Sequence, residues 1–434
     1  MARAHENLIG GKRRPAESGA TFELAAHASS FGTWPRSSAA DVAAAIASAG
    51  AASSTWNGLA HARRREILER AASELAADPD PGGLLAGRLG LEPGELAHEL
   101  RSLPPALDLA LREPFTGFAS RRIAEEGLLL FAPAWSELLA SSAAALFSAL
   151  LLGRTVLFVT DPHAPMIGDA VSAALERAGL DAGVLSIVHD DRDDALRAAI
   201  ASGAATYTRA SGHPTRVRRL ERLVTGGVRT EFGAGVERSL APALDLRILR
   251  NRTAVFRAAE DPEERVVRFA DEAFGRSKSL SGQLPGQLAR VVCPERSFSR
   301  FSEALIAHLR RSPDLARPVP LVEKESEDHL RRVRVLGLDE GATLIFDGED
   351  FVPKPAADGA ETVAPHDSPE NGLGAILSPT VFTNVEERMR LALLGRPAPL
   401  LCLLRVESDE AADALAQRLD RDLPAEDLVL DAEA

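Results

Sequence analysis

The sequence predicts an α/β protein with two domains, the first built around a doubly wound parallel sheet. A chain of 434 residues with 45% hydrophobic composition can bury a large core, but it exceeds the usual size of one domain. Between residues 127 and 188, nearly continuous apolar runs alternate with helical patterns. Such runs are typical of parallel strands that are covered on both faces. The same alternation returns after Glu231.

The first elements are expected to be helices. Residues 38–52 begin with Ser38 three positions before Asp41, which resembles a capping box, and continue as an alanine-rich helix. Apolar residues then recur on one helical face between residues 60 and 77. After the break DPDPGG, a further leucine-rich helical region extends to Leu111.

The parallel sheet is expected next, as strands separated by helices. The segments in chain order are the strand in GLLLFAPAW, an apolar helix over 138–152, the strand TVLFV, a helix through residue 175 and the strand GVLSIV. The apolar helix carries no charge, but it is shorter than the roughly twenty residues that span a bilayer. It is therefore predicted to be a buried helix, and no membrane segment is expected.

The second half repeats the pattern. Helices are predicted around residues 264–274 and 298–310, and strands at ARVVC, ATLIF and PLLCLLRV. The polar stretch 352–372 is predicted to be a surface loop.

Composition excludes several partner classes. Fifty Lys and Arg residues against 63 Asp and Glu residues give a net charge of −13, which argues against nucleic acid and against an anionic membrane surface. Two cysteines cannot form a disulfide framework, and the amino-terminal segment has no apolar signal region. A cytoplasmic location is expected.

Residue by residue, few candidate sites emerge. Cys293 ends an apolar run and Cys402 lies inside another, so both are predicted to be buried core residues and not nucleophiles. The ten histidines show no paired metal-ligand spacing, so no metal site is predicted. A basic helix edge is predicted to be a solvated face, or else to bind an acidic or phosphorylated partner; it comprises Arg216, Arg218, Arg219 and Arg222.

Eight segments are spread in a fixed order from about residue 7 to residue 406, and they include ENLIGGK, EEGLLLFAPAW, GRTVLFV, AGLDAGVLSIV, TEFGAG, SGQLPGQLAR and SPTVFTNV. Together, in this order, they resemble the aldehyde dehydrogenase superfamily. The resemblance implies a Rossmann-type, NAD-binding-type domain over residues 1–231, with a possible oligomerisation hairpin near 115–130. It implies an α/β catalytic-type domain over 232–434 that ends before the superfamily's carboxy-terminal oligomerisation strand.

The resemblance also implies which residues stand at catalytic positions. Enzymes of the superfamily attack an aldehyde with a cysteine thiolate. They stabilise the resulting oxyanion with the backbone N–H of that cysteine and with the side chain of an asparagine. Counted from the Gly-Gln pair, the nucleophile position holds Pro285, which has neither a thiol nor an N–H. The asparagine position holds Ser136, and only Glu231 keeps its type, at the general-base position.

The cofactor positions implied by the resemblance have changed too. Val159 replaces the lysine that contacts the adenosine ribose, Arg209 replaces a glycine close to the cofactor, and Gly395 replaces the glutamate that holds the nicotinamide ribose. Trp135 is the one candidate cofactor-binding residue that keeps its type.

Three functions follow as hypotheses. The favoured one is a pseudoenzyme without a cofactor, which acts as a binding or assembly partner of a true aldehyde dehydrogenase or of itself. The alternative is a divergent NAD(P)-dependent oxidoreductase that acts on an aldehyde or acyl thioester with displaced groups. Unrelated chemistry around Glu231 is a third possibility.

Overall fold

The computed structural model describes residues 3–421 with several gaps. The gaps are 27–28, 91–95, 98–99, 115–126, 214–215, 224–242, 249–250, 258, 276–279, 281, 317–318, 323–324 and 349–375. The chain divides into two compact units. Unit 1 extends to Ile248 and unit 2 begins at Leu249, except that Ala26–Ala28 and His213–Thr215 are assigned to unit 2. The expected boundary at residue 231, the loop over 352–372 and most of the expected hairpin near 115–130 lie outside the described residues.

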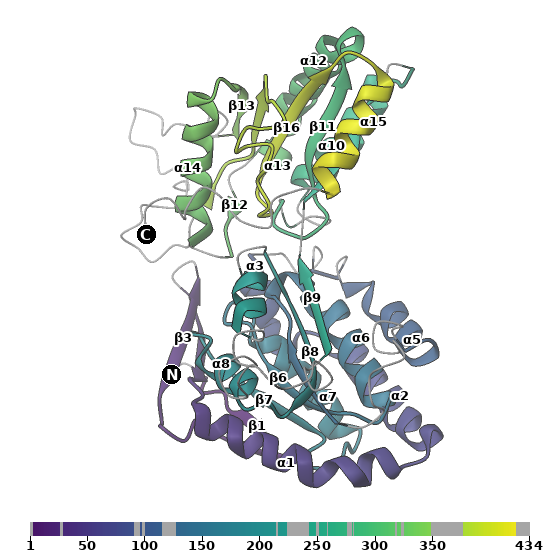
Figure 1. Cartoon of the computed structure of the whole chain (residues 1–434), viewed down its shortest axis with the longest axis vertical. Coiled ribbons are helices and arrows are strands. Elements are labelled where there is room, and N and C mark those ends of the chain that lie inside the picture. The colour runs from purple at the N-terminus through teal and green to yellow at the C-terminus, as the bar shows by residue number, and fades with distance from the viewer. Residues whose placement is uncertain are drawn as a thin grey trace, which may run out of the picture. The chain divides into compact units, whose positions relative to one another are not determined.

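Unit 1 contains a seven-stranded sheet in the order β2-β1-β7-β6-β5-β8-β9 (Figure 1). The strands are β1 Asn7–Ile9, β2 Lys12–Arg14, β5 Leu128–Ala132, β6 Thr155–Val159, β7 Leu185–Val188, β8 Ala205–Gly212 and β9 Ala243–Ile248. Strands β5 to β9 run parallel to one another, whereas β1 is antiparallel to both β2 and β7. The predicted doubly wound sheet is confirmed, and β5 begins within the range expected for the hairpin.

Helices form two packed groups around this sheet. They are α1 Ala39–Gly58, α2 His61–Ala77, α3 Leu84–Leu89, α5 Leu103–Arg112, α6 Leu138–Leu151, α7 Met166–Arg177 and α8 Asp194–Ala201. Helices α1 and α8 pack together, and α2, α5, α6 and α7 form the other group. The predicted capping box is present at the start of α1. A separate hairpin consists of β3 Thr21–Ala26 and β4 Ser29–Pro35.

The sequences of β5, β6 and α6 are almost uninterrupted hydrophobic runs because these elements are buried. Every residue of β5 and of β6 is buried, and so is most of α6. Among the described residues, no helix combines the length and the apolar character that crossing a membrane requires. The charge-free run therefore forms the buried helix that the sequence predicts.

Unit 2 contains a five-stranded sheet in the order β10-β11-β16-β15-β13. Its strands are β10 Arg252–Val255, β11 Leu288–Pro294, β13 Thr343–Asp347, β15 Thr380–Thr383 and β16 Leu400–Val406, and a small ribbon pairs β12 Val319–Pro320 with β14 Ile376–Leu377. Only β13 pairs in the antiparallel sense within this sheet. Its helices are α10 Pro262–Phe274, α12 Glu295–Arg311, α13 Pro313–Ala316, α14 Glu325–Asp339 and α15 Asp409–Arg421. The predicted strands and helices of this half are confirmed.

Candidate functional site

Both cysteine thiols of the chain lie inside the core of unit 2. Cys293 is in β11 and Cys402 is in the adjacent β16, and each is 0% exposed. Burial raises the pKa of the Cys293 thiol above its ordinary range, and it raises the pKa of Cys402 to about 12. The Cys402 thiol lies 3.6 Å from the carbonyl oxygen of Leu391. The prediction that both are core residues is confirmed.

The turn that carries the Gly-Gln pair serves a structural purpose. Gln283 accepts a hydrogen bond from the N–H of Val322 at 2.9 Å, and Gln287 Nε2 donates to the carbonyl oxygen of Ala398 at 2.7 Å. Gly282 has φ +89° and packs so closely on Ala398 that a Cβ would lie 2.6 Å from its carbonyl oxygen. Pro285 lies in this turn and is half-buried. The motif therefore persists with contacts that fix the entry to β11.

The displaced cysteine is far along the strand from this turn. Cys293 is five residues beyond Leu288, where β11 begins. At about 3.3 Å per residue, this separation corresponds to about 17 Å of strand. Cys293 therefore does not substitute for a thiol at Pro285.

The candidate cofactor-binding residue Trp135, the oxyanion position Ser136 and the candidate general base Glu231 lie elsewhere in the chain than the two cysteines. Trp135 begins a short 3-10 turn, Trp135–Glu137, directly after β5 and is almost completely buried. Ser136 in the same turn is half-buried. Glu231 falls in the segment 224–242, outside the described residues. The roles assigned to Trp135 and Glu231 therefore stay predictions.

The three changed cofactor positions are buried in the protein. Val159 ends β6 inside an apolar cluster. The Arg209 side chain in β8 is buried and lies 3.9 Å from Glu137 and 3.5 Å from Asp245. Gly395 is buried as well.

An ion pair that sequence reasoning missed lies at the carboxyl edge of the unit 1 sheet. Arg216 donates to the Asp161 carboxylate at 2.6 Å, and the two side chains are 14% and 6% exposed. Two groups of His163 also contact Asp161 Oδ1: its backbone N–H and its ring Nδ1, each at 2.9 Å. Burial raises the pKa of the Asp161 carboxyl, but Arg216 and His163 outweigh it and hold this pKa well below its ordinary value. The prediction that the basic helix edge is solvated is therefore wrong for Arg216.

A second missed cluster joins the amino-terminal segment to α7. The Asp169 carboxylate accepts hydrogen bonds from His5 Nδ1 at 2.8 Å and from Trp34 Nε1 at 3.0 Å. His189 Nε2 lies 3.7 Å from the same carboxylate, while His189 Nδ1 is 2.9 Å from Thr160 Oγ1. Burial lowers the pKa of His189 to about 4.

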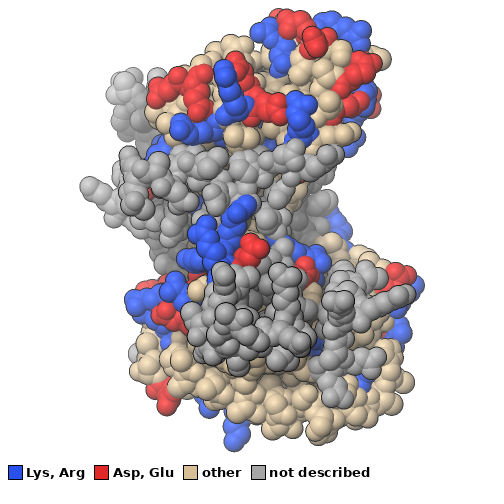
Figure 2. Space-filling model, viewed as in Figure 1, with Lys and Arg blue, Asp and Glu red and all other residues tan. Residues whose placement is uncertain are grey.

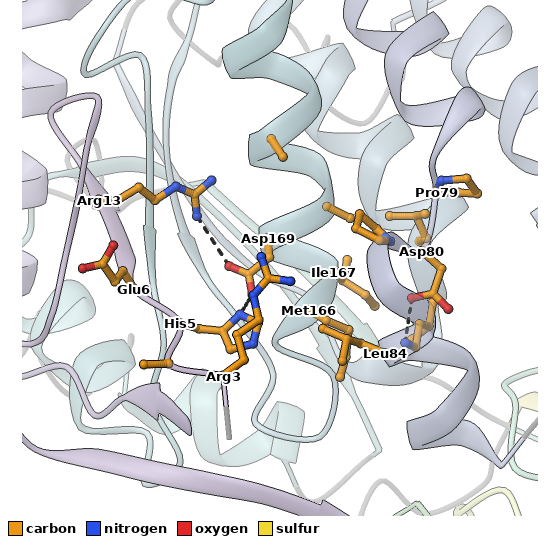
Figure 3. Close-up of a pocket in the computed structure, with 16 residues that line it drawn as sticks. Arg3, His5, Glu6, Arg13, Pro79, Asp80, Leu84, Met166, Ile167 and Asp169 are labelled. Carbon is orange, nitrogen blue, oxygen red and sulfur yellow. Dashed lines mark hydrogen bonds and ion pairs between the residues drawn. The ribbon is translucent and has the colours of Figure 1, made fainter. Parts of the chain in front are cut away.

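This cluster borders a pocket of about 220 Å³ (Figure 3). In the figure His5 and Asp169 lie together with Arg13 above them, Met166 and Ile167 lie beside Asp169 on α7, and Pro79 and Asp80 lie farther across. Polar residues directly follow the strands TVLFV and GVLSIV in the sequence. They could have indicated both clusters, because ligand-binding groups of parallel sheets gather at the carboxyl ends of strands.

Charges of opposite sign lie side by side on the described part of the face in Figure 2. Unit 2 has several exposed ion pairs, among them Arg257–Asp413, Arg296–Asp409 and Arg418–Glu387. Paired charges create no extended field of one sign.

Comparisons with known proteins identify relatives along the whole chain. The sequence model of the Aldehyde dehydrogenase family matches residues 16–102. The α-ketoglutarate semialdehyde dehydrogenase of Haloferax volcanii is 25% identical, with 98% of this chain and 86% of that protein aligned. The vanillin dehydrogenase of Pseudomonas fluorescens is also 25% identical, with 94% and 82% aligned.

Solved structures agree in fold. The aldehyde dehydrogenase of Mycobacterium tuberculosis, solved with NAD+, superposes with a TM-score of 0.76 at 20% identity and covers 96% of this chain and 84% of its own. The NAD-dependent benzaldehyde dehydrogenase of Corynebacterium glutamicum gives 0.75 at 19% identity, with 95% and 86% covered. This chain therefore has the aldehyde dehydrogenase fold, and its residues 16–102 match the family's sequence model.

Two of these similar structures are described as NAD-dependent or were solved with NAD+, so the residues of this chain are compared with the needs of a nicotinamide dinucleotide. Val159 offers no cation, and Arg209 puts a large side chain where the resemblance expects a glycine. Asn251 Nδ2 donates to the carbonyl oxygens of Leu394 and Arg396, on both sides of Gly395, so this segment is tied to its own unit. These residues do not fit the dinucleotide in the way that the resemblance implies.

Proposed function

We propose that this protein uses the aldehyde dehydrogenase fold without the thioester chemistry of the superfamily. It acts as a binding or assembly partner, either of a catalytically active aldehyde dehydrogenase or of a second copy of itself. The observation that supports this proposal is the position of the sulfur atoms: Cys293 and Cys402 are both 0% exposed within β-strands of unit 2.

A buried thiol cannot perform the first step of aldehyde oxidation. The reacting sulfur must be a thiolate and must approach the carbonyl carbon to about 3–3.5 Å. Burial raises the pKa of Cys402 to about 12, so this thiol stays protonated at neutral pH. Proline at 285 also lacks the N–H that would stabilise the oxyanion, and losing one such donor costs about 3–4 kcal/mol in the barrier.

The enzymatic test uses purified protein with NAD or NADP and a panel of aldehydes and acyl thioesters, followed by absorbance of the reduced cofactor. We expect no turnover that depends on a thiol, so the double variant Cys293→Ser, Cys402→Ser should behave as the wild type. A rate that is lost when either cysteine alone becomes serine would contradict the proposal.

The assembly part has a separate test. Sedimentation velocity of the protein alone measures self-association. The same measurement on a mixture with an aldehyde dehydrogenase from the same genome measures hetero-association. A monomer in both samples at micromolar concentration would remove this part of the proposal.

A second candidate function is supported by the relatives. They are aldehyde dehydrogenases, and two of the structures compared above are described as NAD-dependent or solved with NAD+. A divergent NAD(P)-dependent oxidoreductase acting on an aldehyde or acyl thioester is therefore the alternative, and the expectation of no cofactor has no support from these relatives. Substrate turnover that is abolished by Glu231→Ala, together with calorimetric binding of NAD or NADP, would favour this alternative.

A further inference from the structure

The pocket of about 220 Å³ is lined entirely by residues of unit 1, whereas Pro285 and both cysteines belong to unit 2. At about 30 Å³ for each water molecule, this pocket has room for about seven waters or for an organic molecule of similar size. Sites that bind small molecules combine an apolar wall with a few converging polar groups. The pocket has both, and its polar groups carry charge.

Helix α7 provides most of the apolar wall. Its lining residues recur at helical spacing on one face of the helix, and they are Met166, Ile167, Ala170 and Ala173. Leu84 and Leu85 of α3 add further apolar surface. An alkyl chain that lies against this wall leaves water without breaking any hydrogen bond of the protein.

Arg3 places a positive charge at one end of the pocket. The main chain is fixed here by two hydrogen bonds with Thr33. The His5 N–H donates to the carbonyl oxygen of Thr33 at 2.8 Å, and the Thr33 N–H donates to the carbonyl oxygen of Arg3 at 2.9 Å. In Figure 3 the Arg3 side chain extends toward the space between His5 and Ile167. Among the residues that the structure describes, no acidic side chain forms an ion pair with Arg3.

The acidic groups near Arg3 are engaged elsewhere. The Asp169 carboxylate accepts a hydrogen bond from His5 Nδ1 at 2.8 Å, and Arg13 lies 3.6 Å from it. Glu6 lies on the other side of His5 in Figure 3. The Arg3 guanidinium therefore keeps its N–H donors for a bound anion.

Asp80 places a negative charge across the pocket. One oxygen of its carboxylate accepts the Leu85 N–H at 2.8 Å, and the other accepts the Ala86 N–H at 2.9 Å. These bonds hold the carboxylate at the start of α3, and each oxygen keeps a free lone pair. Within the described part of the chain, no basic side chain forms an ion pair with Asp80. In Figure 3, Asp80 and Arg3 lie on opposite sides of Ile167.

We propose that this pocket binds a small ω-amino carboxylate, with its carboxylate on Arg3, its ammonium group on Asp80 and its alkyl chain against α7. A ligand with a single charge would leave one end of the pocket without a partner. An α-amino acid carries both charges at the same end, whereas Arg3 and Asp80 are separated by the apolar wall. 5-Aminopentanoate has about eight non-hydrogen atoms, which matches the room for about seven waters.

The test is calorimetric titration of the full chain with 5-aminopentanoate, pentanoate and pentylamine. These molecules share the same alkyl chain and differ in their charged ends. We expect 5-aminopentanoate to bind about 5- to 10-fold more tightly than either singly charged molecule. A charged hydrogen bond to a partly exposed partner contributes a factor of about this size.

Two substitutions assign each end of the ligand to one residue. Arg3→Gln should weaken binding of 5-aminopentanoate and pentanoate about 5- to 10-fold and leave pentylamine unchanged. Asp80→Asn should weaken 5-aminopentanoate and pentylamine and leave pentanoate unchanged, which separates a lost contact from a disturbed start of α3. Ala173→Leu fills the pocket from α7 and should weaken all three. Arg70→Gln, at an exposed arginine of α2 outside the pocket, is the matched control and should bind like the wild type.

Circular dichroism and thermal unfolding identify the variants that are folded before titration. No heat of binding with about 10 mM 5-aminopentanoate, equal affinities for the three molecules, or wild-type affinity in Ala173→Leu would each overturn the proposal. The same holds if folded Arg3→Gln weakens pentylamine as much as pentanoate. The titrations contain neither cofactor nor aldehyde, so their result is separable from that of the proposed function.

Discussion

The buried histidine beside α7 should make the stability of unit 1 depend on pH. His189 is 0% exposed and lies near three groups that carry or can carry charge, namely Asp169, His5 and Arg13. Burial is the largest influence on its ring and lowers its pKa from 6.5 to about 4, although Asp169 opposes this effect. In the unfolded chain the ring would take up a proton at its ordinary pKa.

The sign and size of the effect follow from this difference. Between pH 6.5 and pH 4 the unfolded state binds up to one more proton than the folded state, so the free energy of unfolding falls as the pH falls. A difference of 2.5 pKa units corresponds to about 3 kcal/mol at 1.36 kcal/mol per unit. The stability is fully present above pH 6.5 and is lost toward pH 4.

Urea unfolding at pH 7.5, 6.5, 5.5 and 4.5, followed by tryptophan fluorescence, measures this slope. We expect His189→Gln to unfold with a slope reduced by up to about 1.4 kcal/mol per pH unit, whereas the exposed His61→Gln should keep the wild-type slope. Equal slopes for His189→Gln and the wild type over this range would show that the buried ring is not the source.

Three further predictions concern packing. Gly168→Ala in α7 places a Cβ 2.6 Å from Thr160 Cγ2. The variant should lower the free energy of unfolding, measured by denaturant titration, by about 1–3 kcal/mol. An unchanged unfolding midpoint would show that residue 168 does not pack this closely against Thr160. Cys293 and Cys402 should react with a thiol reagent only after unfolding, so two fast-reacting thiols in the native protein would contradict their burial. The Arg290 guanidinium donates to Thr253 and to main-chain carbonyls. Arg290→Leu should therefore lower the free energy of unfolding of unit 2 by about 1–3 kcal/mol for each buried partner left unsatisfied. A decrease of less than about 1 kcal/mol would count against that hydrogen-bond network.

The order of elements could be predicted because apolar periodicity reports burial. The central strands of both units were found from continuous apolar runs, since these strands are covered on both faces. The three-residue strands β1 and β2 were missed, and so was α14. In β1, Leu8 pairs with Ile187 of β7, so this strand is fixed by a neighbour that lies almost 180 residues away and not by its own pattern.

The site was predictable where it depended on local sequence and not where it depended on distant pairs. Burial of Cys293 followed from the apolar letters around it. Arg216 looked solvated because its partner, Asp161, is 55 residues earlier in the chain. Likewise, the contact between His5 and Asp169 spans 164 residues, and a single sequence carries no local sign of such a pair.

The place of β16 in unit 2 has a consequence for synthesis. This strand lies between β11 and β15 in the sheet, yet 106 residues separate Pro294, the end of β11, from Leu400, the start of β16. At about 5–20 residues per second, a ribosome leaves one edge of β11 unpaired for roughly 5 to 20 seconds. During that interval an apolar strand edge is open to other nascent chains, so we expect the yield of folded protein to depend on chaperones and on translation speed past residue 294.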